Sequence, residues 1–232
     1  MIEKRPFAAL GSFRNEWLES RFHFSFAEYH DRERMGFGSL RVWNDDIIKP
    51  GTGFGMHPHR DMEIITWVRT GAITHEDSLG NRGRTAAGEV QVMTAGTGIT
   101  HSEYNLESED TTLFQIWIVP AETGHPPHWA TRTFPARDDA GRLRVLASGR
   151  AGDEGALPLH QDAAVLAATL KAGQSVTHGF ATGRRAYLVP TTGTVVINGV
   201  RIGPRDGAAI ADEAEIIIEA PEDSEIVLVD VA

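Results

Sequence analysis

The spacing of short apolar runs constrains the fold of this chain of 232 residues more than any other feature. Each run is bounded by Gly, Pro, Asn or Asp, and helical periodicity is scarce. Period-two alternation between turn residues is typical of β-strands, and Asn198-Gly199 is a strong hairpin signal. The pattern predicts an all-β sandwich or barrel. We expect a turn or short helical piece at 28–35, and strands at 21–27, 38–43, 63–68, 90–93, 113–119, 143–147, 165–170, 186–189, 194–198, 208–211, 215–218 and 226–231.

A weak internal repeat divides these strands into two halves. The stretch EIITWVRTGAITHED at 63–77 resembles RAYLVPTTGTVVING at 185–199, and Gly71 falls on Gly193. Self-similarity of this kind indicates a duplicated structural unit. The repeat therefore predicts two similar β-barrels in tandem.

The stretch 120–142 is rich in Pro, Gly and charge, which is typical of a linker or crossover between domains. We therefore expect an N-terminal barrel over 1–135 and a C-terminal barrel over 136–232.

Composition excludes several classes of function. The chain has no cysteine, so disulfides, thiolate metal sites and cysteine nucleophiles are excluded. Its formal net charge of −10 makes direct nucleic-acid binding and attraction to anionic membranes unfavourable. The first residues carry charges throughout, unlike a secretory signal, and no apolar run is long enough to span a bilayer. We therefore expect a cytoplasmic protein.

The motif HPHRDME contains the first group of candidate metal ligands. His57 and His59 are two residues apart, and such residues point to the same face of a β-strand. Pro58 between them stiffens the backbone. Glu63 has the same parity and could face inward with them.

The motif THSEYN contains the second group. His101 and Glu103 are again two residues apart, and Asn105 keeps their parity. About 40 residues separate the two motifs, which leaves room for the pairs to meet across a barrel. Three imidazoles with a carboxylate suit Fe, Mn, Ni, Cu or Zn. At this point either Glu63 or Glu103 could complete the ligand set.

Both motifs resemble the cupin signatures, with departures. Gly71 follows Glu63 after seven residues rather than six, Thr94 stands where Pro is usual, and His101 follows Gly96 after four residues rather than two. The longer stretches FGSLRVWNDDIIKPGTGFGMHPHRDMEIITWV, GAITHEDSLGN and VMTAGTGITHSEYN resemble the pirin family. This resemblance is dense over 20–120 and looser beyond.

The pirin resemblance implies a bicupin, with two jelly-roll-like cupin barrels in tandem. It implies one divalent metal ion held by His57, His59, His101 and Glu103, with Glu63 outside the ligand set. The Gly71–Gly193 alignment puts no histidine at the corresponding positions of the second barrel, so we expect that barrel to lack metal. Iron is the favoured ion, with Cu, Ni, Mn, Co and Zn as alternatives.

The resemblance also implies a quercetin 2,3-dioxygenase type of activity on a small aromatic substrate with dioxygen, in a monomer. Glu103 is the first candidate for the catalytic base. Glu63 is the second, with a role as hydrogen-bond partner of a histidine ligand as its alternative. Phe54, Met56, His75 and Asn105 are candidates for the pocket or the surroundings of the ligands. The other histidines are expected to be structural or superficial.

Two other functions compete with this hypothesis. One is a non-enzymatic regulator whose metal changes oxidation state and thereby alters binding of a protein partner. The other is a cupin isomerase or hydrolase that uses Zn, which has no redox chemistry, as a Lewis acid.

Overall fold

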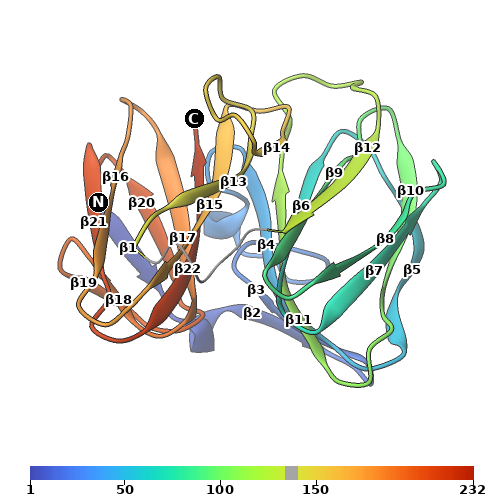
Figure 1. The fold of residues 1–232 in the computed structure, drawn as a ribbon, viewed down its shortest axis with the longest axis horizontal. Coiled ribbons are helices and arrows are strands. Elements are labelled where there is room, and N and C mark those ends of the chain that lie inside the picture. Colours follow the sequence, from blue (N-terminus) through green and yellow to red (C-terminus); the bar gives the residue numbers. More distant parts are fainter. Residues whose placement is uncertain (134–140) are drawn as a thin grey trace. The chain divides into compact units, whose positions relative to one another are not determined.

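The computed structural model describes residues 1–133 and 141–232 (Figure 1). The all-β prediction is confirmed: in this part of the chain the only helical pieces are the short 3-10 helices η1 (Phe7–Ala9) and η2 (Arg32–Arg34). The second of these lies in the predicted turn at 28–35, where Asp31 accepts a hydrogen bond from the Glu33 backbone N–H.

The chain forms two compact units. The N-terminal unit comprises residues 11–133 and Leu157–Gln161, and the C-terminal unit comprises Met1–Leu10, residues 141–156 and Asp162–Ala232. These ranges differ at both ends from the predicted division into 1–135 and 136–232. The first residues belong with the C-terminal unit because β1 (Ile2–Arg5) pairs along its whole length with β20 (Gly207–Ala211). The predicted boundary itself lies outside the described residues.

The N-terminal unit contains two antiparallel sheets (Figure 1). The larger has the order β12-β9-β6-β11-β4-β3-β2 and the smaller the order β5-β10-β7-β8. The strands are β2 (Gly11–Arg14), β3 (Leu18–Phe22), β4 (Leu40–Ile48), β5 (Thr52–His59), β6 (Glu63–Thr70), β7 (Ala72–Asp77), β8 (Arg82–Ala86), β9 (Glu89–Thr94), β10 (Ile99–Asn105), β11 (Thr111–Ile118) and β12 (His128–Thr133). The two-residue strand β14 (Leu157–Pro158) also lies in this unit but outside these two sheets.

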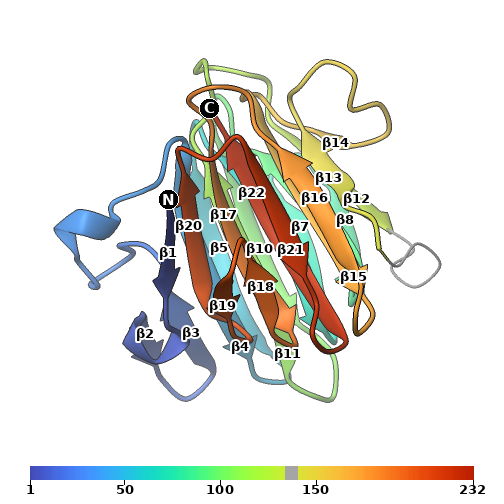
Figure 2. The same cartoon turned by 90° about the vertical axis from the view of Figure 1, so that its left-hand side faces the viewer.

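The C-terminal unit repeats this arrangement (Figures 1 and 2). One sheet places β1, β20, β17, β22, β15 and β13 side by side in that order, and the other has the order β16-β21-β18-β19. Their bounds are β13 (Arg144–Ser148), β15 (Ala163–Leu170), β16 (Ser175–Gly179), β17 (Arg185–Thr192), β18 (Val195–Ile197), β19 (Val200–Ile202), β21 (Glu215–Glu219) and β22 (Ser224–Val231).

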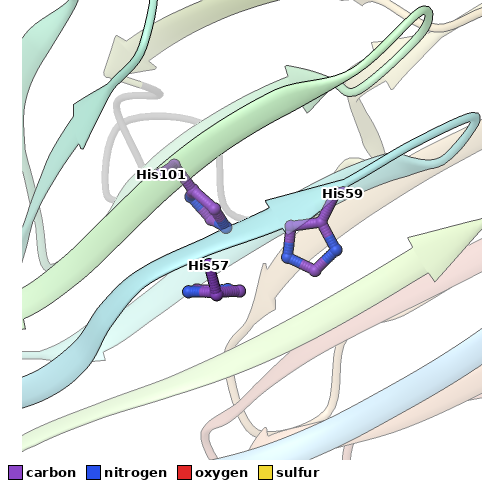
Figure 3. Close-up of side chains that lie close together, drawn as sticks. All are labelled: His57, His59 and His101. Carbon is purple, nitrogen blue, oxygen red and sulfur yellow. The ribbon is translucent and has the colours of Figure 1, made fainter.

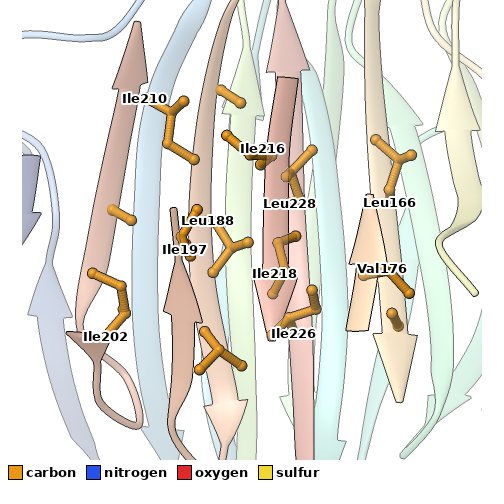
Figure 4. Packing of buried hydrophobic residues seen from close by; sticks show 14 of the residues in the cluster. Leu166, Val176, Leu188, Ile197, Ile202, Ile210, Ile216, Ile218, Ile226 and Leu228 are labelled. Atoms are coloured by element: carbon orange, nitrogen blue, oxygen red, sulfur yellow. The ribbon is translucent and has the colours of Figure 1, made fainter. Parts of the chain in front are cut away.

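The cores of the two units differ in continuity. In the C-terminal unit, buried aliphatic side chains such as Leu166, Leu188 and Leu228 form one cluster between the sheets (Figure 4). Two clusters of the N-terminal unit are smaller: one contains Ile73 and Leu113, and another contains Met93 and Ile99. Polar side chains occupy the space that apolar groups fill in the C-terminal unit, as described below.

Two strand predictions need correction. The strand predicted at 21–27 is observed at Leu18–Phe22, and the chain then leaves the sheet, with Ala27 at a φ of 49°. The predicted linker at 120–142 contains β12, which pairs with β9 over its six residues. β12 is an edge strand and its residues are mostly exposed. Its sequence therefore lacks the alternation of buried and exposed residues that identifies a strand.

The predicted repeat has a structural counterpart at its two aligned glycines. Gly71 has a φ of 73° and Gly193 a φ of 68°, a region that favours glycine. A Cβ on Gly71 would meet Thr111, the first residue of β11, and a Cβ on Gly193 would overlap Ser224, the first residue of β22. The two glycines therefore lie at equivalent turns of the two units, and each approaches the first residue of the equivalent strand, β11 or β22.

We expect Gly193→Ala to lower the free energy of unfolding by about 2 kcal/mol, since a left-handed conformation and an overlap with Ser224 would both be imposed. Gly199→Ala is the matched control. Gly199 has a φ of 84° with nothing within 4 Å of an added Cβ, so only the conformational cost applies. Urea unfolding of both variants measures the difference, and equal losses would contradict the close approach.

Among the described residues, no helix has the length and apolar character required to cross a membrane.

Candidate metal centre

Two neighbouring strands bring three imidazoles together. In the antiparallel pair of β5 and β10, His57 lies directly opposite His101. The ring centroid of His57 is 4.4 Å from that of His101 and 4.8 Å from that of His59, and the centroids of His59 and His101 are 5.0 Å apart. Figure 3 shows the three side chains turned toward a common point. Their ligand atoms lie within 4.8 Å of one another.

The hydrogen bonds and burial of these rings favour neutral imidazoles with free lone pairs. His57 Nδ1 lies 2.7 Å from the Gly55 carbonyl oxygen, so Nδ1 carries the proton and Nε2 is left as an acceptor. Burial lowers the pKa of His101 to about 2, helped by the nearby His57 and His59. Burial and His57 likewise lower the pKa of His59 to about 4. Metal ions bind the neutral form of histidine, so these shifts favour a metal site.

His101 Nε2 is the observation that most directly calls for a ligand. The atom is buried and has no hydrogen-bond partner among the described residues. A buried polar atom without a partner is costly, and such atoms are rare in native proteins. A cation bound between the three imidazoles would satisfy it, so the residues present fit a divalent metal ion.

A second group of candidate ligands shares His101. The ligand atoms of His75, His101 and Glu103 also lie within 4.8 Å of one another. His75 is fully buried, stacks on Trp129 and lies 3.0 Å from the Asp77 carboxylate through Nε2. His75 is therefore a buried neighbour of His101, with its Nδ1 3.4 Å from His101 Nδ1.

A row of polar side chains on the opposite sheet holds Glu103. Gln91 Nε2 donates to Oε1 at 2.6 Å, Thr66 Oγ1 donates to the same oxygen at 3.3 Å, and Gln115 Nε2 donates to Oε2 at 2.7 Å. A carboxylate has about four acceptor positions, so three are occupied and one is left on Oε2. Burial raises the pKa of Glu103. The three donors orient the carboxylate and restrain it from swinging as a base would.

These side chains form a continuous line across the larger sheet, which we call the polar row: Gln91, Thr66, Gln115 and Asn44. Gln91 pairs with Thr66, Thr66 with Gln115, and Gln115 with Asn44 on neighbouring strands. All four are buried. The row explains why the apolar core of the N-terminal unit is divided.

The C-terminal unit has an apolar row at the corresponding place. The Gly71–Gly193 alignment puts Thr66 on Leu188, and Leu188 pairs with Ala208 and Leu228 as Thr66 pairs with Gln91 and Gln115. These three side chains belong to the continuous core cluster.

The facing sheet of the C-terminal unit also lacks the imidazoles. In the ladder between β16 and β21, Gly179 lies opposite Glu215, as His57 lies opposite His101 in the other unit. Among the described residues, both candidate ligand groups lie in the N-terminal unit.

Glu63 lies outside the site, although parity along the sequence allowed it inside. β5 ends at His59 and β6 begins at Glu63, and Asp61 between them has a φ of 46°, so the alternation restarts. Glu63 therefore faces away from Thr66 and its row. Its carboxylate accepts from Thr94 Oγ1 at 2.9 Å and lies 3.2 Å from His160 Nδ1. Burial raises its pKa.

Two other predicted pocket residues are placed elsewhere. Met56 is 59% exposed. It is adjacent to His57 along β5, and adjacent residues of a strand point to opposite faces, so Met56 faces solvent. Asn105 is fully buried and closes a turn: its Nδ2 donates to the carbonyls of Ile48 and Glu109.

An aromatic cavity of about 270 Å³ opens beside the site. Phe54 lines it, packs edge-on against Trp17 at 5.1 Å and has its ring 6.3 Å from that of His57. Gln115 also lines it and bonds Glu103. The cavity therefore lies next to His57 through Phe54 and next to Glu103 through Gln115. Small-molecule sites commonly combine apolar walls with a few polar groups in this way.

Sequence reasoning missed the polar row and the acids beside it. A signal was present: Gln115 interrupts the apolar run LFQIWI, and Asn44, Asp45 and Asp46 interrupt RVWNDDII. Polar residues in the middle of a strand otherwise expected to be buried indicate an internal polar site.

Comparisons with known proteins agree with this geometry. The family model described as pirin matches residues 4–118, and that described as quercetinase C-terminal cupin domain matches residues 145–231. The chain is 57% identical to a pirin-like protein of Caulobacter vibrioides over 100% of both chains. It is 47% identical to quercetin 2,3-dioxygenase of Escherichia coli K12, covering 99% of this chain and 98% of the relative.

The structure is also similar to solved structures. The crystal structure of a bacterial pirin from Escherichia coli in complex with nickel(II) superposes with a TM-score of 0.94 at 44% identity, covering 100% of this chain and 99% of the other.

Proposed function

The chain belongs to the pirin family, and from this membership we propose that it is a quercetin 2,3-dioxygenase-type enzyme, which opens a flavonol with dioxygen at one divalent metal ion. The observation that carries the proposal is the grouping of three imidazoles, those of His57, His59 and His101. Within this group, Nε2 of His101 is buried and has no hydrogen-bond partner among the described residues. Relatives named for this activity match the chain over nearly its whole length.

We propose His57, His59, His101 and Glu103 as the ligands. His57, His59 and His101 lie together and would supply neutral nitrogen donors. Glu103 is grouped with His101 and His75 rather than with His57 and His59, and its remaining acceptor position would supply one carboxylate oxygen. When bound, a redox-active ion supplies activation of dioxygen and charge stabilisation for an anionic substrate oxygen.

The protein's own groups prepare the site for this chemistry. The bond from His57 Nδ1 to the Gly55 carbonyl selects the tautomer, and the donors of the polar row hold Glu103 in place. The rings of Phe54 and Trp17 provide flat walls beside His57 for an aromatic substrate.

We propose that the chain holds one ion. In the C-terminal unit, the counterparts of the polar row are Leu188, Ala208 and Leu228, which offer no ligand atoms and no hydrogen bonds to orient a carboxylate. Among the described residues, neither candidate ligand group lies in the C-terminal unit.

The protein loaded without oxygen with Fe, Cu, Ni, Co or Mn is expected to consume quercetin when oxygen is admitted. Loss of the flavonol absorbance and release of carbon monoxide measure the reaction. Protein loaded with Zn, which has no redox chemistry, serves as the control. Failure of every redox-active metal to support flavonol loss would contradict the proposal and would favour a regulator that binds a protein partner.

Iron is the native metal that we propose, and nickel(II) is the ion bound by the relative from Escherichia coli. Because affinity and availability decide occupancy, elemental analysis of the protein isolated from its own cells tests this choice. A cytoplasmic location and a monomeric state remain predictions.

A further inference from the structure

The cavity beside the candidate ligands has a polar floor whose groups the proposed metal site does not use. Asn44 and Asp46 project from the same face of β4, and both line the cavity. The aromatic side chains of Phe13, Phe26 and Phe54 also line the cavity. Given the proposed function, Asn44 and Asp46 are candidates for binding and deprotonating a hydroxylated substrate.

Asp46 is a buried carboxyl group with one oxygen left to accept a hydrogen bond. It is 1% exposed, and Ser20 Oγ donates to its Oδ1. Among the described residues, none donates a hydrogen bond to its Oδ2. Burial raises the pKa of Asp46 to about 7, with further contributions from Asp45 and Glu103 that outweigh Arg69. A pKa near neutrality suits a group that exchanges protons at physiological pH.

Asn44 offers a second unused group on the same floor. It is 3% exposed, and its Oδ1 is buried without a hydrogen-bond partner among the described residues. An amide oxygen can only accept, so the group that would satisfy it is a donor such as a hydroxyl. Asn44 and Asp46 are two residues apart on one strand, and both line the cavity.

The other buried carboxyls are less suited to receive a substrate proton. Glu103 is bound by three donors and is proposed as a metal ligand. Glu63 bonds Thr94 and His160, and it lies on the face of β6 away from the cavity. Asp46 is the remaining acid that faces the cavity.

We infer that Asp46 accepts the proton from the substrate hydroxyl, and that Asn44 Oδ1 accepts a hydrogen bond from a second hydroxyl. In this step the substrate O–H bond breaks, an O–H bond forms at Asp46 Oδ2, and the electron pair stays on the substrate oxygen. The resulting anion can bind a cation, and no oxidant takes part. The floor would thus favour planar aromatic substrates with at least two hydroxyl groups.

The test uses metal-loaded protein without oxygen, with quercetin as the probe. Wild-type protein is expected to bind quercetin with the red-shifted absorption of the flavonol anion. Asp46→Asn should bind it with the absorption of the neutral flavonol, and its kcat should fall at least about 100-fold, which is the usual contribution of a general base. Glu63→Gln is the matched control: it makes the same change at a buried acid outside the cavity and should keep the anion band.

Ser20→Ala provides a second, milder variant that keeps the carboxylate. Loss of the Ser20 hydrogen bond removes a group that lowers the pKa of Asp46, while Asp45, Glu103 and Arg69 remain. The acid limb of the pH profile of kcat/KM should therefore move to higher pH. Metal content and thermal unfolding of each variant show whether the site is intact.

The outcomes separate the two proposals. An anion band and unchanged kcat in Asp46→Asn, or an unmoved acid limb in Ser20→Ala, would overturn the inference and leave the dioxygenase standing. Wild-type protein that neither binds nor consumes quercetin would overturn the proposed function, and this inference with it.

Discussion

His101→Ala is expected to weaken binding of divalent metal by more than about 100-fold, since loss of even an outer partner of a ligand typically costs 10–100-fold. The fold should remain, because His101 Nε2 has no hydrogen-bond partner among the described residues and Nδ1 has only a long contact of 3.4 Å with His75 Nδ1. Calorimetric titration measures the affinity. Thermal unfolding provides a second readout: metal should raise the Tm of the wild type but not that of the variant.

Three further variants locate the metal within the two overlapping ligand groups. His178→Ala removes a histidine of the C-terminal unit and should leave metal content unchanged. His57→Ala should lose metal as His101→Ala does, whereas His75→Ala should retain most of it. If His75→Ala lost metal and His57→Ala retained it, the ion would be assigned to the group of His75, His101 and Glu103 instead.

Asp230→Ala is expected to destabilise the protein by about 3 kcal/mol, the lower end of the range for breaking a buried ion pair, since Arg150 is partly exposed. Asp230 is 1% exposed and accepts from Arg184 Nε at 2.7 Å, and it lies 2.7 Å from Arg150 Nη2 and 2.8 Å from His178 Nε2. Its loss would leave two guanidinium groups without this partner. Denaturant unfolding measures the change.

The effect of Asp230 should depend on pH in a defined direction. Burial opposes its ionisation, but the bonds from His178, Arg184 and Arg150 prevail and lower its pKa. A depressed pKa contributes stability above the ordinary value of about 4, and this contribution is lost as the pH falls through the folded value. The difference between wild type and variant should therefore narrow below about pH 4. Asp223→Ala, at an exposed pair with Lys171, should cost much less stability than Asp230→Ala and serves as the control.

The two units show how one scaffold supports two different interiors. In the N-terminal unit, Gln91, Thr66 and Gln115 occupy paired positions on neighbouring strands of the larger sheet. All three donate hydrogen bonds to the Glu103 carboxylate. Polar groups in this setting are tolerated because they satisfy one another. The aliphatic residues at the same positions of the C-terminal unit need no such partner. The polar row therefore marks the unit in which chemistry is proposed.

The amino-acid sequence by itself determined the all-β class, the duplication and the pairing of imidazoles. Period-two alternation, turn glycines and the two-residue spacing of His57 and His59 are local properties, so they can be recognised without coordinates. The aligned Gly71 and Gly193 likewise record the repeat, because each turn requires a left-handed residue.

Only the tertiary structure decided which acids meet the imidazoles. Parity counted along the chain put Glu63 with His57, but the turn at Asp61 restarts the alternation and sends Glu63 to the other face. The polar row and Asp46 depend on the register of strands far apart in sequence. Such register is set by pairing across the whole sheet, which no local pattern specifies.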